Sequence, residues 1–80
     1  MEIQVLGPGC PNCKRLAQLV EVVLREGAWT AEVRKVTDME EILAQGVLRT
    51  PGLAIDGALK SQGRIPSRQE VRDWIEQAQA

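Results

Sequence analysis

The sequence contains no histidine, no tyrosine and no phenylalanine, and only two of its 80 residues are cysteines. Without histidine, a tetrahedral zinc site would need further ligands beside the two thiolates. The formal net charge of −1 gives no reason to expect binding to nucleic acid or to an anionic membrane. We find neither a basic leader with an apolar core nor an apolar run that could span a bilayer, so we expect no signal peptide and no membrane segment.

The composition is that of a small globular protein, with 44% hydrophobic and 26% charged residues. No repeat, linker or low-complexity segment divides the chain, so we expect a single domain over residues 1–80. Two cysteines without an export signal indicate a reducing compartment, here the cytoplasm. In that setting a cysteine pair is expected to be catalytic or metal-binding and not a structural scaffold.

Both cysteines lie in residues 7–13, which read Gly-Pro-Gly-Cys-Pro-Asn-Cys. The apolar run before them, over residues 3–6, predicts a strand. Apolar residues recur over residues 11–26 with the spacing of a helix that buries one face. Pro11 suits the first helical position, where a missing N–H costs nothing. We therefore predict a tight strand-to-helix turn with Cys10 at or next to the N-cap.

This placement predicts different chemistry for Cys10 and Cys13. Residues three apart on a helix are neighbours, roughly 5–6 Å apart at Cβ, which is close enough for a disulfide. A helix N-terminus favours an anion, so the thiol of Cys10 should ionise more readily than an ordinary thiol. Cys13 should face the core and be the more protected sulfur. The pattern predicts a nucleophilic cysteine with a resolving partner.

The middle of the chain predicts a strand and a short helix. Gly27 is expected to end the first helix. Apolar and polar residues then alternate over residues 29–34, as in a half-exposed strand. Thr37 and Glu40 match a capping box, which predicts a helix start. We expect this helix to end at Gly46.

The last part of the chain predicts a hairpin followed by a helix. The Asp-Gly pair at 56–57 is a strong hairpin signal between strands at residues 53–55 and 58–62. A second capping box over residues 67–70 opens the final helix. Its predicted apolar face consists of Val71, Trp74, Ile75 and Ala78.

Together these segments give the order βαβαββα. Two strands joined through a helix should be parallel, with a right-handed crossover, and the hairpin strands should be antiparallel. The predicted fold is α/β, with one four-stranded mixed sheet and helices on both faces.

In this layout the chain resembles the thioredoxin fold in its smallest, glutaredoxin-sized form, and most closely the small redox-active disulfide proteins with a CPxC motif. Three features carry the resemblance: Cys10-Pro11-Asn12-Cys13 after the first strand, Thr50-Pro51 before the third strand, and the hairpin turn at 56–57. The resemblance implies thiol–disulfide exchange, in which Cys10 attacks and Cys13 resolves. It also implies a cis bond between Thr50 and Pro51.

The same resemblance implies the rest of the site and its partners. Pro11, Asn12, Thr50 and Pro51 are the implied substrate-binding residues, with the backbone of Thr50 free to pair with an extended substrate. The implied substrates are protein or small-molecule disulfides, and no cofactor is expected beyond the reversible disulfide. A reductase of the thioredoxin-reductase type and glutathione are the alternative electron sources, and a monomer is expected.

The chain also departs from the larger relatives near the motif. Thioredoxins carry a tryptophan directly before the first cysteine and a buried acid six residues before it, where this chain has Gly9 and Gln4. Gln4 cannot relay a proton to Cys13. Glutaredoxins usually carry an aromatic residue where this chain has Asn12.

A metal-binding module is the alternative function. Metallochaperone domains of the ferredoxin-like fold also place a CxxC between a first strand and a first helix, and two thiolates suit Cu(I). That fold needs two strands straight after the first helix, whereas the residues from Thr37 onward predict a helix. It also assigns no role to Thr50-Pro51. The sequence therefore favours redox exchange.

Four other side chains are predicted to be structural or solvated. Trp29 and Trp74 should anchor the core. Lys14 and Arg15 should lie on a solvated face of the first helix, where their charge has a small effect on Cys10.

Overall fold

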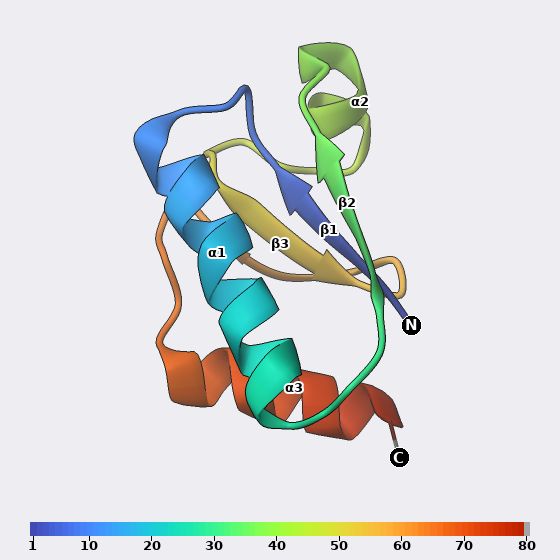
Figure 1. Ribbon diagram of the computed structural model, residues 1–80. Helices are drawn as coiled ribbons and strands as arrows, with labels where there is room; N and C mark the ends of the chain where they lie inside the picture. Colours follow the sequence, from blue (N-terminus) through green and yellow to red (C-terminus); the bar gives the residue numbers. More distant parts are fainter. Residues whose placement is uncertain (80) are drawn as a thin grey trace.

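The computed structural model describes residues 1–79 and has the predicted order of elements (Figure 1). The strands are β1 (Glu2–Leu6), β2 (Glu32–Val36), β3 (Gly52–Ile55) and β4 (Ala58–Gln62), and the helices are α1 (Pro11–Glu26), α2 (Met39–Ala44) and α3 (Arg68–Gln79). The bounds of α1 are those that its apolar spacing predicts. Within residues 1–79, no helix combines the length and the hydropathy that a membrane span requires.

The strands form one mixed sheet in the order β2-β1-β3-β4. β1 and β2, which α1 connects, are parallel, and β3 and β4 form the predicted antiparallel hairpin. β1 and β3 are also antiparallel, with Leu6 at the end of β1 opposite Gly52 at the start of β3. This register brings the cysteine loop after β1 and the Thr50–Pro51 segment before β3 to the same end of the sheet.

Helices pack on both faces of the sheet, as predicted: α1 and α3 on one face and Ile42 of α2 on the other. Figure 1 shows α2 beside the end of β2. Successive residues of a strand point to opposite faces, and β1 shows this directly. Ile3 and Val5 belong to the larger core, which includes buried side chains of α1 and α3. Leu6 belongs to a smaller core on the α2 side, which consists of Leu6, Val36, Ile42, Val47 and Ala54. The cysteine loop therefore rests on a sheet that is packed from both sides.

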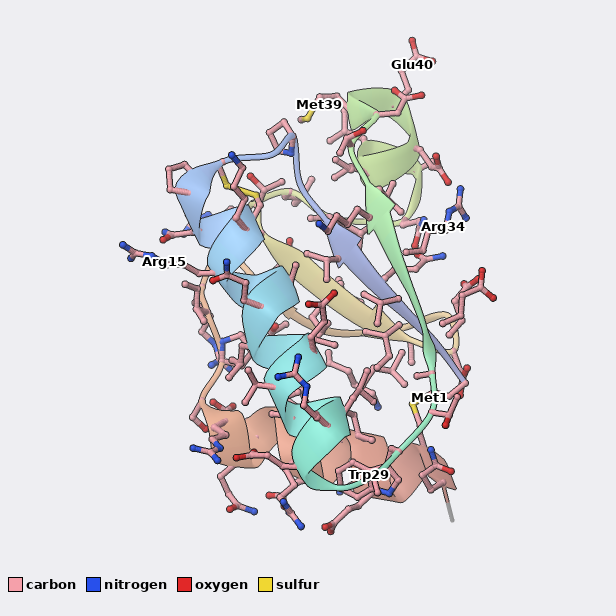
Figure 2. All side chains as sticks on the ribbon, viewed as in Figure 1. Met1, Arg15, Trp29, Arg34, Met39 and Glu40 are labelled. Atoms are coloured by element: carbon pink, nitrogen blue, oxygen red, sulfur yellow. A yellow bond between two sulfur atoms is a disulfide. The ribbon has the colours of Figure 1, made fainter. Side chains whose placement is uncertain are left out.

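The two tryptophans anchor the larger core, as predicted. Trp29 and Trp74 are half-buried and pack against it. Trp29 lies close to α3 (Figure 2), and the guanidinium of Arg72 sits 5.4 Å from the centre of its ring. This contact connects the segment after α1 to α3, at the end of the molecule away from the cysteines.

The second strand starts later than its alternating pattern predicts. β2 begins at Glu32, whereas the pattern starts at Trp29. The N–H of Trp29 donates to the carbonyl of Leu24 at 2.9 Å, and the preceding Ala28 has a φ of 53°. Residues 29–31 therefore form the connection between α1 and β2, and pairing with β1 begins at Glu32.

The first capping box is wrong by one residue. Asp38, not Thr37, is the N-cap of α2, and its Oδ1 accepts a hydrogen bond from the N–H of Glu40 at 3.0 Å. Val36 still belongs to β2, and its carbonyl accepts from the N–H of Gly7 at 2.9 Å. β2 thus ends at Val36, directly before Thr37, and the N-cap position of α2 falls on Asp38.

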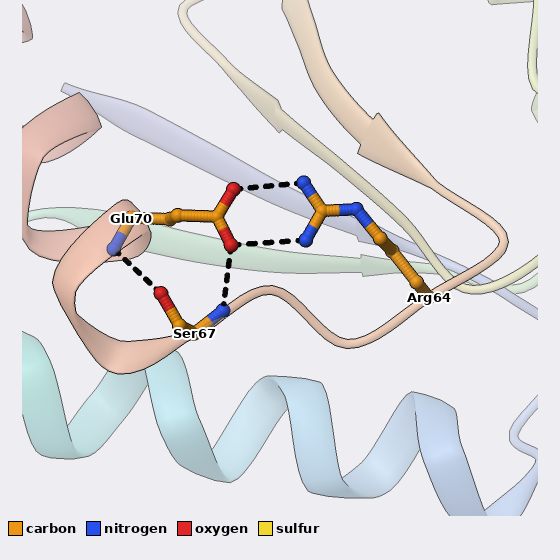
Figure 3. A network of polar contacts seen from close by, with 3 residues as sticks. All are labelled: Arg64, Ser67 and Glu70. Atoms are coloured by element: carbon orange, nitrogen blue, oxygen red, sulfur yellow. Dashed lines mark hydrogen bonds and ion pairs between the residues drawn. The ribbon is translucent and has the colours of Figure 1, made fainter.

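The second capping box is confirmed at the start of α3 (Figure 3). The Oγ of Ser67 accepts from the N–H of Glu70 at 3.1 Å, and the N–H of Ser67 donates to the Glu70 carboxylate at 3.0 Å. Arg64 adds two hydrogen bonds to this carboxylate, at 3.0 and 2.8 Å. The bonds from Arg64, followed by that from the Ser67 backbone, lower the pKa of Glu70 to about 2.

The apolar face of α3 is shorter than predicted. Val71 and Ile75 are buried and Trp74 is half-buried, but Ala78 in the last turn is exposed.

Candidate active site

The start of α1 places a sulfur atom at the helix N-terminus. Cys10 is the N-cap, with φ −65° and ψ 163°, and its Sγ accepts from the N–H of Cys13 at 3.2 Å. Pro11 follows in the first turn, as predicted, and no acidic side chain lies in that turn. The free N–H groups there are therefore left to the sulfur, which suits a thiolate.

The two cysteines differ in exposure. Cys10 and Cys13 form a disulfide with their Cα atoms 5.0 Å apart, visible as the yellow bond at the start of α1 in Figure 2. Cys13 is buried, with only 5% of its surface exposed, whereas Cys10 is partly exposed. The side chains of Pro11 and Asn12 are exposed between them. An incoming group therefore meets Cys10 before Cys13.

Gly7 is a site residue whose importance the sequence alone does not reveal. A β-carbon at this position would overlap the Sγ of Cys13 and would lie 3.7 Å from the Cβ of Thr50. Only a residue without a side chain lets the buried sulfur pack directly against the end of β1. The one available signal is a glycine between a strand and a cysteine pair, and that pattern equally suits a simple turn.

The segment before β3 reaches the cysteines through Gly7. The Thr50–Pro51 peptide bond is cis, as the resemblance implies. Pro51 is buried and its carbonyl accepts from the N–H of Gly63 at 3.0 Å. Thr50 is partly exposed and lies beside the Cα of Gly7. The structure thus brings Thr50 next to the cysteine loop, although the two are distant in the sequence.

Gln4 lies on the far side of the sheet from the cysteines. Along β1 it shares a face with Leu6, whereas Val5 faces α1. Its Nε2 donates to Glu2 at 2.9 Å, and its buried Oε1 has no hydrogen-bond partner among residues 1–79. The amide of Gln4 is thus directed away from the face of the sheet that carries the cysteines.

A cavity of about 120 Å³ adjoins the disulfide. It lies between the cysteine loop, the first turn of α1 and the end of β2, and its wall includes Gly9, Cys13, Lys14, Lys35 and Thr37. The prediction of a solvated face holds for Arg15, which points away from the sheet (Figure 2). Lys14 is exposed as well, as predicted, and it also contributes to the wall of this cavity.

The surroundings of the dithiol are poor in metal ligands. Among residues 1–79, no group of three or more His, Cys, Asp or Glu side chains could hold a metal ion together. The chain after α1 forms β2 and then α2, not the strand pair of a ferredoxin-like metallochaperone. The architecture around the CxxC is thus that of the redox alternative.

Comparison with known proteins agrees with this geometry. Residues 1–76 match the family model described as a thioredoxin domain. The chain is 40% identical over 72 residues to a thioredoxin of Methanothermobacter thermautotrophicus, which covers 90% of this chain and 94% of that protein. It is 39% identical over 73 residues to a thioredoxin of Methanocaldococcus jannaschii, covering 91% and 84%. These matches and the CxxC pair support a thiol–disulfide oxidoreductase over a metal chaperone, and the chain belongs to the thioredoxin family.

Proposed function

We propose that Cys10 is the attacking thiolate and Cys13 the resolving thiol in the reduction of disulfide substrates. The observation that carries this assignment is the asymmetry of the pair. Cys10 is the partly exposed N-cap of α1, whereas Cys13 is 5% exposed and packs against Gly7. A nucleophile needs access and a stabilised thiolate, and a resolving thiol needs only to reach the first sulfur.

The exchange balances in two steps. The Cys10 thiolate attacks one sulfur of the substrate disulfide, which gives a mixed disulfide with Cys10 and releases the other substrate sulfur as a thiolate. Cys13 then loses its proton and attacks Sγ of Cys10, so that the second substrate thiolate leaves and the Cys10–Cys13 disulfide forms. The dithiol thereby loses two electrons and two protons, which the two substrate thiols gain. This chemistry needs no group beyond the two cysteines.

The substrate segment is proposed to lie between Thr50 and the exposed first turn of α1. Thr50 is partly exposed beside Gly7, which supports pairing of its backbone with an extended peptide. Pro11 and Asn12 are exposed next to Cys10 and offer contacts on the other side. Pro51 supports the position of Thr50, since it is buried and held by Gly63.

The wider setting follows from the family. We propose that residues 1–80 act as a single, monomeric domain in the reducing environment of the cytoplasm. Its substrates would be protein or small-molecule disulfides, and a reductase of the thioredoxin-reductase type would return the electrons. Sedimentation of the purified protein and reduction assays with candidate reductases test the monomer and the electron source separately.

Trapping of mixed disulfides tests the assignment of roles. Cys13→Ser keeps the attacking sulfur and removes the group that releases the substrate, so this variant should accumulate mixed disulfides in a lysate. On a non-reducing gel they appear as bands of higher mass that reductant collapses. Cys10→Ser is the matched control and should trap far less, because its remaining sulfur is buried. Equal trapping by both variants would contradict the assignment.

The same two variants separate redox exchange from copper transfer. Two thiolates that bind Cu(I) act as equivalent ligands, so either substitution should abolish tight copper binding to a similar degree. The proposed function instead expects weak copper binding by the parent protein and asymmetric trapping. Tight copper binding together with no trapped species would overturn the redox assignment.

A further inference from the structure

The cavity beside the disulfide has two exposed lysines in its lining. Lys14 of α1 and Lys35 of β2 both line it. Among residues 1–79 neither lysine forms an ion pair, whereas Arg34, Arg64 and Arg68 each pair with a glutamate. No aspartate or glutamate of the chain lines the cavity. Two lysines from different elements therefore line one cavity that has no acidic residue in its wall.

The cavity also lies within reach of a substrate attached to Cys10. Cys13 forms part of its wall, and so does Gly9, the residue directly before Cys10. Gly9 has a φ of +93°, and a side chain built on it would meet nothing within 4 Å. The space above Gly9 is thus open. The cavity therefore adjoins the residue before Cys10, on a side that no protein atom covers.

We propose that this cavity is a subsite for the carboxylate of an acidic residue that neighbours the disulfide cysteine of a polypeptide substrate. The inference rests on the proposed function. The ammonium groups of Lys14 and Lys35 attract a carboxylate, and the attraction is modest because both side chains are exposed. A polypeptide is favoured because Gly7, which also lines the cavity, lies beside Thr50, where an extended segment is proposed to pair.

Three disulfide-bridged peptides that differ only in the residue next to one cysteine test the subsite. With Glu, Gln or Lys at that place, the rate of reduction by the dithiol form should fall in this order. We expect the Glu peptide to react about twofold to fivefold faster than the Gln peptide at low salt, as for exposed ion pairs. The preference should shrink when the ionic strength is raised.

Substitution of the lysines locates the preference. In the double variant Lys14→Gln/Lys35→Gln the ratio of Glu to Gln rates should approach one, and Lys14→Arg/Lys35→Arg should restore it. The ratio is taken within each variant, so any change in thiol reactivity cancels. Lys60→Gln on β4, which does not line the cavity, is the matched control and should keep the ratio of the parent protein.

The outcomes separate the subsite from the proposed function. Equal rates for the three peptides, or a preference that survives the double variant, would overturn the subsite and leave disulfide reduction intact. No reduction of any peptide would overturn the proposed function and the subsite with it.

Two small disulfides test the choice of a polypeptide substrate. Dithiodipropionate carries carboxylates, whereas hydroxyethyl disulfide carries uncharged hydroxyl groups in their place. A charge preference with this pair and none with the peptides would overturn the choice of a polypeptide.

Discussion

The starts of α1 and α3 solve the same physical problem in opposite ways. Every helix begins with N–H groups that lack a partner and with a positive end of the macrodipole. At α3, Ser67 and Glu70 satisfy these groups, and Arg64 holds the carboxylate in place. At α1 the first turn has no acid, and the N-cap side chain is the sulfur of Cys10. The positive end of α3 is neutralised by the Glu70 carboxylate, whereas that of α1 is available to the Cys10 thiolate.

This difference separates a stabilising device from a reactive one. The carboxylate at α3 is a permanent anion that fixes the loop between β4 and the helix. The sulfur at α1 becomes an anion only when the disulfide is reduced, so the favourable interaction with the helix end is available to the reactive form. The four predictions below exchange or remove these features, from the largest expected effect to the smallest.

The largest effect is expected from Gly7→Ala, which removes the space for Cys13 beneath α1. The new methyl group overlaps the Sγ of Cys13, and overpacking of this kind costs about 1–3 kcal/mol. Denaturant unfolding of the oxidised protein measures the loss. The same substitution in a Cys13→Ala background should cost clearly less, because the sulfur is gone. An equal cost in both backgrounds would show that the contact with the sulfur is not the cause.

Asn12→Asp makes the start of α1 resemble that of α3. The new carboxylate lies in the first turn and competes with the Cys10 thiolate for the same positive end of the helix. Alkylation of Cys10 in the reduced protein at neutral pH should slow by about threefold to tenfold. Gln18→Glu, which adds the same charge further along α1, is the control and should change the rate little. A faster reaction in Asn12→Asp would contradict the proposed role of the helix end.

Ser67→Ala removes the cap of α3 and leaves that of α1 unchanged. Loss of an N-cap side chain costs about 1 kcal/mol, so the free energy of unfolding should fall by that amount. The rate of disulfide exchange should stay the same, because the change lies outside the cysteine loop. Ser67→Thr keeps the hydroxyl group and should retain most of the stability. A comparable loss in both variants would rule out the cap as the cause.

The smallest effect concerns the acid limb of stability. The pKa of Glu70 is lowered to about 2 from an ordinary value of 4.5, so the folded state prefers the charged carboxylate. Its contribution is complete above about pH 4.5 and is lost as the pH falls towards 2. Glu70→Gln should flatten the dependence of stability on pH in this window. Arg64→Gln removes the main cause of the shift and should flatten it in the same way.

Local patterns predicted most of the fold. The apolar spacing of α1 set both of its ends, and the Asp-Gly pair at 56–57 placed the hairpin. The capping box at residues 67–70 was right because all of its partners lie within one helical turn. The box at Thr37 failed because Thr37 and Asp38 are both good N-cap residues. The choice between them depended on how far β2 continues along β1, which is a contact between distant segments.

The sequence by itself determined the parts of the site that lie within a few residues of each other. The two cysteines, Pro11 between them and the N-cap position of Cys10 all follow from the start of one helix. The tertiary structure alone decided that Gly7 must lack a side chain, that Thr50 lies beside it, and that Lys14 and Lys35 line one cavity. These contacts depend on the order and register of β1, β2 and β3, which the packing of the whole chain sets and no local pattern encodes.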